Sequence, residues 1–242
     1  MTGSSPSSTG ISVWDLPTRL FHWLLVLLVA FLWLTGEVGG ITVNIPLPGG
    51  ERLFLDNMAL HMLAGRAVLV LVLFRLGWGL VGSSTARFAS FVRGPGAAVA
   101  YVKQVARGQL PLTVGHNPAG GLMILALLLF LLVQAGTGLF ARDDLFSEGP
   151  LAHLVSESAS GRLTFVHVVM FKVLLVLVLA HLAAAVYYAI RGKNLVRPMI
   201  TGRKPASLVP AGAAQSVRLA PAWLAVPVLA AAAVAVWALH LL

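Results

Sequence analysis

The stretch LTFVHVVMFKVLLVLVLAHLAAAVYYAI, residues 163–190, decides the fold, because it is long and apolar enough to cross a lipid bilayer. It contains two histidines, His167 and His181, fourteen residues apart. At about 100° per residue, fourteen steps fall about 40° short of four turns, and slight under-winding in a packed bundle brings both rings to one face. With a rise of about 1.5 Å per residue, the rings stand roughly 21 Å apart. Since a neutral imidazole can ligate a metal ion or haem iron, this helix could hold one cofactor near each side of a membrane.

The composition is that of a membrane protein with several spans. The 242 residues are 58% hydrophobic and only 10% charged, and the mean hydropathy of +0.90 exceeds what a soluble domain needs. The sequence contains no cysteine, which excludes disulfides, iron–sulfur clusters, thiolate-ligated haem and covalent haem attachment through C-x-x-C-H. Any haem must therefore be held non-covalently, by histidine or methionine.

Five apolar stretches reach the length of a membrane span. They run over residues 19–36, 58–81, 119–140, 163–190 and 221–242. We predict an all-α integral membrane fold with a four-helix transmembrane bundle in residues 13–200, followed by a basic linker and a fifth transmembrane helix in 201–242. Residues 1–12 are expected to form a flexible cytoplasmic lead without a cleavable signal peptide. No strands are expected, since only helices and closed barrels cross a bilayer, and these stretches are too long for barrel strands.

Charge predicts the orientation through the positive-inside rule. The loop between the second and third spans and the tail after the fourth span carry basic residues and no acids: Arg87, Arg93, Lys103, Arg107, Arg191, Lys193, Arg197, Arg203, Lys204 and Arg218. The other side carries the acids Glu37, Glu51, Asp56, Asp143, Asp144, Glu148 and Glu157. We therefore predict a bacterial inner-membrane protein with a cytoplasmic N-terminus and a periplasmic C-terminus. The net charge of +9 then reflects loops that face lipid headgroups, and no nucleic-acid partner is expected.

The predicted topology sorts the histidines by depth. His22 and His181 fall near the cytoplasmic side, and His61 and His167 near the outer side. Each pair lies on two different helices at one level, as a six-coordinate haem with two axial imidazoles requires. The alternative is that these are hydrogen-bonded packing residues, although ionisable groups inside a membrane are usually functional.

Four segments resemble the bacterial cytochrome b561 and nickel-hydrogenase b-type cytochrome superfamily. They are VWDLPTRLFHWLLVLLVAFLWLTG (13–36), HMLAGRAVLVLVLFRLGWGLVGSSTARF (61–88), GHNPAGGLMILALLLFLLVQAGTGLF (115–140) and HVVMFKVLLVLVLAHLAAAVYY (167–188). The resemblance implies a four-helix core that holds two non-covalent haem b groups and exchanges electrons with quinone and partner redox proteins. It implies that His22, His61, His167 and His181 are the axial ligands. The fifth predicted span departs from the family's minimal four-helix pattern.

Several neighbouring residues are candidates for holding the haems. Arg19 is one turn from His22 and could bind the inner haem's propionates, or could reach to the membrane surface as an interfacial cation. Arg66 and Lys172 each follow an outer histidine by five residues, so that each could bind an outer propionate or belong to a polar quinone or proton pocket. Gly65 could let a flat macrocycle approach the backbone, or could serve helix packing.

Two further residues have simpler expected roles. Arg75, near the inner end of the second span, is expected to be a membrane-surface anchor. His116 in the Gly-His-Asn-Pro sequence either completes the turn that Asn117 caps or exchanges protons beside a quinone.

These features predict an electron-transfer protein, which could form part of a quinone-linked oxidoreductase. Its partners would be membrane lipid, quinone or quinol, and a c-type cytochrome or a dehydrogenase or hydrogenase subunit; a homo-oligomer is a further expectation. Two alternatives remain at this point: a non-redox transporter or proton channel that uses the membrane histidines and cations as a relay, and a structural anchor subunit.

Overall fold

The computed structural model describes residues 10–143 and 147–241. Most of the predicted cytoplasmic lead, and Asp144 of the acidic set, lie outside the described residues. The chain divides into two compact units, and the long helices contribute residues to both. Unit 1 comprises residues 1–20, 75–127 and 177–228; unit 2 comprises residues 21–74, 128–176 and 229–242.

Four helices are long and apolar enough to cross a membrane. They are α1 (Leu16–Trp33), which continues into the π-helix η1 (Leu34–Val38), α2 (Asn57–Val81), α5 (Pro118–Gly138) and α6 (Glu157–Ile190). The predicted all-α, multi-pass membrane fold with four spans is confirmed. The helix α6 is uninterrupted and contains both His167 and His181.

Each of these helices is preceded by a polar residue whose side chain accepts a hydrogen bond from the backbone N–H three residues later. The acceptors are Asp15 for α1 at 2.7 Å, Asp56 for α2 at 2.7 Å, Asn117 for α5 at 2.7 Å and Ser156 for α6 at 3.3 Å. Such caps satisfy donors that the first helical turn leaves unpaired. The predicted cap at Asn117 is therefore confirmed.

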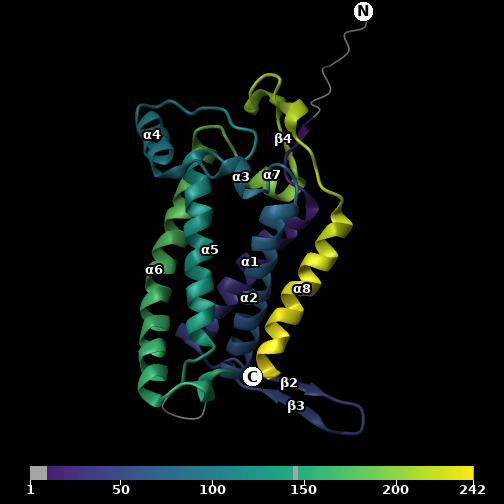
Figure 1. Ribbon diagram of the computed structural model, residues 1–242, viewed down its shortest axis with the longest axis vertical. Coiled ribbons are helices and arrows are strands. Elements are labelled where there is room, and N and C mark those ends of the chain that lie inside the picture. The colour runs from purple at the N-terminus through teal and green to yellow at the C-terminus, as the bar shows by residue number, and fades with distance from the viewer. Residues whose placement is uncertain (1–9, 144–146, 242) are drawn as a thin grey trace, which may run out of the picture. The chain divides into compact units, whose positions relative to one another are not determined.

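The expectation of no strands is wrong for the connecting segments. In unit 2, β2 (Val43–Pro46) pairs antiparallel with β3 (Arg52–Leu55) in a hairpin between η1 and α2 (Figure 1). Its turn contains Gly49 and Gly50, whose φ angles of 97° and 88° suit glycine. In unit 1, β1 (Ile11–Ser12) pairs with β4 (Arg203–Lys204). These strands lie outside the four long helices, so the argument that excludes strands from the bilayer does not apply to them.

The predicted fifth transmembrane helix is not confirmed. The structure has α8 (Ala225–Ala238) in this region, flanked by short 3-10 turns. Fourteen residues at about 1.5 Å each give roughly 21 Å, less than a bilayer core of about 30 Å. Pro221 and Pro227 account for the late start, because proline is tolerated only within the first turn of a helix.

Several short helices complete the fold. They are α3 (Phe88–Phe91), α4 (Gly94–Ala106), η2 (Ala152–Leu154), α7 (Val196–Thr201), η3 (Ala206–Leu208), η4 (Ala213–Ser216), η5 (Ala222–Leu224) and η6 (Leu239–Leu241).

Arg75 is buried within unit 1, so its predicted role as a membrane-surface anchor is wrong. The side chain is only 2% exposed and donates to the Ala86 carbonyl at 2.9 Å. Its guanidinium also lies 4.9 Å from the centre of the Phe88 ring. The position of a cation in the sequence does not reveal such a set of partners, so the positive-inside rule alone could not predict that Arg75 is buried.

Cations of unit 1 bind the segment that follows α4. Arg191 donates to the Gly108 carbonyl at 3.3 Å, Lys193 to the Leu110 carbonyl, and Lys204 to the Thr113 carbonyl at 2.6 Å. Burial, together with the neighbouring Lys193 ammonium, lowers the pKa of Lys204 to about 8. These three basic side chains therefore join segments of unit 1 that are distant in sequence.

A second link within unit 1 joins α4 to α6. The hydroxyls of Tyr101 and Tyr188 form a hydrogen bond of 2.9 Å, and both side chains are buried. Burial and this bond raise the pKa of Tyr101, so its phenol stays neutral over the physiological range.

Candidate functional site

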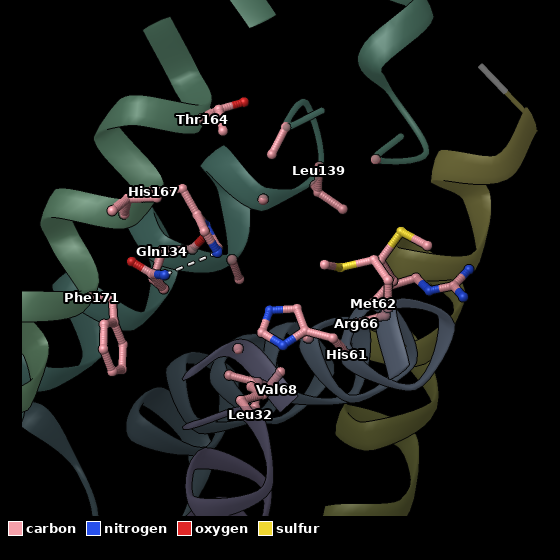
Figure 2. A pocket seen from close by; sticks show the side chains of 18 of the residues that line it. Leu32, His61, Met62, Arg66, Val68, Gln134, Leu139, Thr164, His167 and Phe171 are labelled. Atoms are coloured by element: carbon pink, nitrogen blue, oxygen red, sulfur yellow. Dashed lines mark hydrogen bonds between the residues drawn. The ribbon is translucent and has the colours of Figure 1, made fainter. Parts of the chain in front are cut away.

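Unit 2 contains a cavity of about 310 Å³ (Figure 2). Its walls come from α1, η1, α2, α5, α6 and the loop between α5 and α6. The volume falls in the range of about 300–1,000 Å³ that small-molecule and cofactor sites occupy. The lining is mainly aliphatic, with a few polar groups, as is usual for such sites.

His61 from α2 and His167 from α6 both project into this cavity (Figure 2). Their ring centres are 6.4 Å apart, and the ring planes are inclined by 77°. The structure thus brings together two of the four histidines predicted from the sequence, and it does so for the predicted outer pair.

Thr35 of η1 fixes the His61 ring. Its hydroxyl lies 2.9 Å from His61 Nδ1, and it donates within its own helix to the carbonyls of Phe31 at 3.0 Å and Leu32 at 3.2 Å. Because the hydroxyl proton of Thr35 is donated to these carbonyls, its oxygen accepts a hydrogen bond from the Nδ1–H group of His61. Nε2 of His61 then keeps a lone pair with which it can ligate a metal.

His167 is fixed in a similar way by α5. Its Nδ1 lies 2.9 Å from the Gln134 carbonyl oxygen and 3.3 Å from the Thr137 hydroxyl. A carbonyl can only accept, so Nδ1 of His167 carries the proton and Nε2 carries the lone pair. The side-chain amide of Gln134 lies 3.1 Å from that Nε2 and donates to it (Figure 2). A metal ligated by this nitrogen would require the amide to turn aside.

A glycine follows each of the two threonines and lies against the histidine ring. A Cβ at Gly36 would lie 3.3 Å from His61 Cε1, and one at Gly138 would lie 2.9 Å from His167 Cε1. Gly65 differs, because it lines the cavity and a Cβ there would meet nothing within 4 Å. Open space beside Gly65 favours the close approach of a flat group over helix packing.

The cavity lining carries charges of both signs. Arg66, predicted from the sequence, is among the lining residues, as are Arg142, Glu37 and Asp143. Lys172 is exposed on α6 and is not among them.

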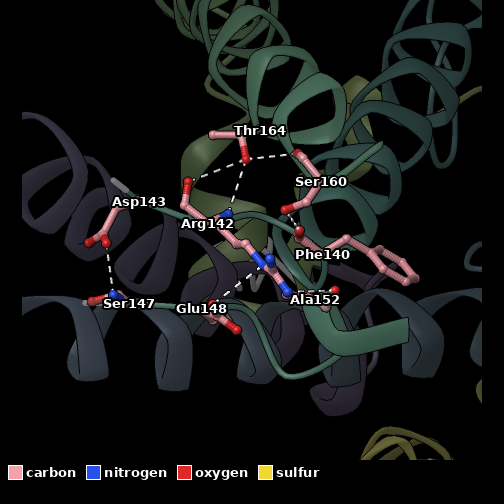
Figure 3. Close-up of polar contacts among 8 residues, drawn as sticks. All are labelled: Phe140, Arg142, Asp143, Ser147, Glu148, Ala152, Ser160 and Thr164. Carbon is pink, nitrogen blue, oxygen red and sulfur yellow. Dashed lines mark hydrogen bonds and ion pairs between the residues drawn. The ribbon is translucent and has the colours of Figure 1, made fainter. Parts of the chain in front are cut away.

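Sequence reasoning did not identify Arg142 as a lining residue. Its Nε lies 3.5 Å from a Glu148 carboxylate oxygen, its Nη2 donates to the Ala152 carbonyl at 3.2 Å, and its backbone N–H donates to Thr164 at 3.1 Å (Figure 3). The loop therefore presents this guanidinium in one defined place.

The inner pair of histidines falls in different units. His22 lies in unit 2, where its ring packs edge-on against Trp23 at 5.0 Å, and His181 lies in unit 1. Their pairing stays a prediction. Arg19 of unit 1 donates to the Ile200 carbonyl at 2.5 Å.

His116 has a packing environment. Its ring centre lies 4.5 Å from that of Trp14 and 5.0 Å from that of Phe91, all within unit 1. Its two expected roles stay predictions.

The two histidines at the cavity suit a metal whose other ligands come from a cofactor. Among the described residues, no group of three or more histidine, cysteine, aspartate or glutamate side chains could hold a metal ion. A protein-bound zinc ion needs three or four such ligands, whereas a haem iron needs only one or two axial ligands. The pair formed by His61 and His167 fits haem better than a bare ion.

The family model described as prokaryotic cytochrome b561 matches residues 13–202. The chain belongs to this family. It is therefore a membrane b-type cytochrome, a class of protein that carries electrons on haem b. This membership confirms the family predicted from the sequence.

Two curated relatives carry the description "Probable Ni/Fe-hydrogenase 1 B-type cytochrome subunit", one from Escherichia coli strain K12 and one from Escherichia coli O157:H7. Each is 36% identical to this cytochrome b561 family member over 81 residues, which cover 31% of the chain. The match spans 33%, about a third, of each relative's length. No solved structure matches the chain.

Three residues that hydrogen-bond the rings of His61 and His167 were not predicted from the sequence: Thr35, Thr137 and Gln134. A signal was present, since the dipeptide Thr-Gly ends the first span and recurs at the end of the third. A histidine follows 26 residues after the first threonine and 30 residues after the second.

Proposed function

We propose that this protein is a transmembrane electron carrier in which His61 and His167 ligate one haem b in the cavity of unit 2. The observation that carries the proposal is the pair of imidazoles, 6.4 Å apart in one cavity, each with its Nδ1 proton engaged elsewhere. Two nitrogens that each bind one metal at about 2 Å, with ring centres about 1 Å further out, give ring centres about 6 Å apart. The spacing is therefore what axial ligation of a single iron needs.

When bound, haem b supplies a one-electron couple at the iron. The two imidazoles leave the iron no open coordination position, which favours electron transfer over oxygen chemistry. The mainly aliphatic walls of the cavity would limit the access of water to the haem. Arg66 and Arg142 line the cavity and would supply cations to pair with the two haem propionates. Without such cations, carboxylates in a dry site would stay unpaired at a high cost in free energy.

A second haem b between His22 and His181 completes the proposal. Its support is the location of His167 and His181 on one continuous helix, the predicted depths, and the family resemblance. Arg19 would serve the propionates of this inner group. Two haems at different depths would allow electrons to cross the bilayer one at a time.

The charges of the two units support an orientation. Asp15 is the single acidic residue in the segments of unit 1, whereas the other acids belong to the segments of unit 2. By the positive-inside rule, the connecting segments that carry Arg87, Arg93, Lys103 and Arg107, and those that carry Arg191, Lys193, Arg197 and Arg203, would face the cytoplasm.

We further propose that the protein connects the quinone pool with a redox enzyme. The relatives named as hydrogenase cytochrome subunits suggest a hydrogenase as one such partner. A c-type cytochrome or a dehydrogenase subunit is the other candidate class.

The test is a reduced-minus-oxidised visible spectrum of the purified protein, with quantitative haem extraction. We expect b-type bands and about two haems per chain. Replacing His61 or His167 with alanine should each remove the same outer haem, and replacing His181 should remove the inner one. His153→Ala, at an exposed position in η2, serves as the control. Absence of b-type bands from haem-supplied protein would leave the transporter or anchor alternatives in front, and retention of the outer haem in His61→Ala would exclude the proposed ligand pair.

A further inference from the structure

We propose that Thr35 and Thr137 are positioning residues that tune the reduction potential of the outer haem, and that Thr35 does so more strongly than Thr137. This inference rests on the proposed ligation by His61 and His167. It goes further in assigning a role to two hydroxyls that are not ligands and in ranking their effects.

The first step is the recurrence of one arrangement on two pairs of helices. In each pair, a threonine near the end of one helix bonds Nδ1 of a histidine on the next helix, at 2.9 Å for Thr35 and 3.3 Å for Thr137. Each threonine hydroxyl also donates to the carbonyl four residues earlier, at 3.0 Å and 2.8 Å respectively. Each threonine precedes the glycine that lies against the ring. Two occurrences of the same set of contacts argue against chance packing.

The second step is the effect of these contacts on the ligand. An acceptor that binds the Nδ1–H group fixes the tautomer of the imidazole. It also makes Nε2 a stronger electron-pair donor to the metal. A more basic axial ligand favours the ferric over the ferrous state and lowers the reduction potential. Removing the acceptor should therefore raise the potential.

The third step is the inequality between the two sides. The Nδ1 proton of His167 has a second strong acceptor, the Gln134 carbonyl at 2.9 Å, which lies closer than Thr137. For His61 the Thr35 hydroxyl is the acceptor that meets hydrogen-bond geometry, and the Leu32 carbonyl gives a further polar contact to the ring. Loss of Thr137 therefore leaves the His167 proton bonded, whereas loss of Thr35 removes the main partner of His61.

The experiment compares Thr35→Val with Thr137→Val in the haem-loaded protein. Redox titration should show a higher midpoint potential for the outer haem of Thr35→Val, with a change of about tenfold in its equilibrium constant of reduction, which is 59 mV for one electron. The shift in Thr137→Val should be less than half as large. Thr35→Ser keeps the hydroxyl and should restore a potential near that of the unaltered protein.

Three outcomes would overturn the inference: equal shifts in the two valine variants, no shift in a protein that still binds haem, or the same shift in Thr35→Ser as in Thr35→Val. Thr35→Ala provides a smaller side chain if the valine variant does not fold. Nitrogen-15 NMR of the haem-free protein gives a separate reading, because His61 should lose its fixed Nδ1–H tautomer in Thr35→Val but keep it in Thr35→Ser. If the protein binds no haem, the proposed function fails, and the NMR result still decides whether Thr35 positions His61.

Discussion

A graded series of alanine substitutions at three glycines tests how the cofactor cavity is built. A Cβ added at Gly138 or Gly36 would press against a histidine ring, whereas a Cβ added at Gly65 would meet no atom within 4 Å. The three sites differ in how far a new methyl group would intrude, so their effects on the protein and on haem binding should separate.

The magnitudes follow from the contact distances. Carbon atoms rest about 3.5–4.0 Å apart, so a Cβ at Gly138, only 2.9 Å from His167 Cε1, must displace the ring by roughly 0.6 Å or more. A shift of that size can break the 2.9 Å bond between His167 Nδ1 and the Gln134 carbonyl. We expect Gly138→Ala to cost about 1–3 kcal/mol of stability. At Gly36 the distance of 3.3 Å requires a shift of only a few tenths of an ångström, and the cost should be smaller.

Gly65→Ala should act with opposite signs on the free and the loaded protein. Without haem, alanine in a helix is favoured over glycine by up to about 1 kcal/mol, and nothing lies within 4 Å to oppose it. With haem, the methyl group would occupy the space that the macrocycle needs. Haem retention should therefore fall while the stability of the haem-free protein rises.

The assay is thermal unfolding in detergent, with and without added haem, combined with haem content after purification. Three results would refute this account of the cavity. Gly138→Ala could prove as stable as Gly36→Ala, which would remove the ring contact from the argument. Gly65→Ala could destabilise the haem-free protein, which would contradict the open space beside this glycine. It could also bind haem as well as the unaltered chain does, which would place the cofactor elsewhere.

Three further predictions concern unit 1. The pKa of Lys204 is about 8 in the folded protein and 10.5 in the unfolded chain, so the unfolded chain binds more protons between these pH values. The free energy of unfolding should therefore rise from pH 8 to pH 10.5 by at most about 3 kcal/mol. Thermal unfolding of a Lys204→Met variant over the same range should lack this rise. Replacing either Tyr101 or Tyr188 with phenylalanine leaves a buried hydroxyl without its partner and should cost about 1–3 kcal/mol, while a double-mutant cycle should show that the double variant loses less than the sum. Arg75→Met should cost about 1–3 kcal/mol, because it leaves the buried Ala86 carbonyl without the donor that lies 2.9 Å away; unaltered thermal stability of this variant would contradict a stabilising role of Arg75.

The four spans could be predicted because hydropathy over about twenty residues reports directly on the transfer of a helix into lipid. The ends of the helices were less accessible. The helix α6 begins at Glu157 and not at 163, because its polar first turn is stabilised by the Ser156 cap and by the Ser160 hydroxyl, which donates to the Phe140 carbonyl at 2.7 Å. Hydropathy does not detect such bonds.

The outer histidines could be paired from depth alone, since the alternation of spans fixes which ends share a side. Their support could not be derived in the same way, because Thr35 and Thr137 act through bonds between different helices, and side-chain contacts between helices depend on rotation about each helix axis. Lys172 shows the same limit. Five residues beyond His167, it was predicted to bind an outer propionate or to belong to a polar quinone or proton pocket; its side chain is exposed on α6, and its role stays a prediction.

The repeated threonine–histidine arrangement has a consequence for how the protein is made. Each histidine and its support lie on consecutive helices, so each half of the outer site is complete once one helical hairpin has left the ribosome. About a hundred residues separate the two halves, and at about 5–20 residues per second the second follows the first by roughly 5–20 s. On the proposed ligation, the first imidazole is already oriented in the membrane during this interval, and the iron can gain both axial bonds only after the second hairpin has inserted.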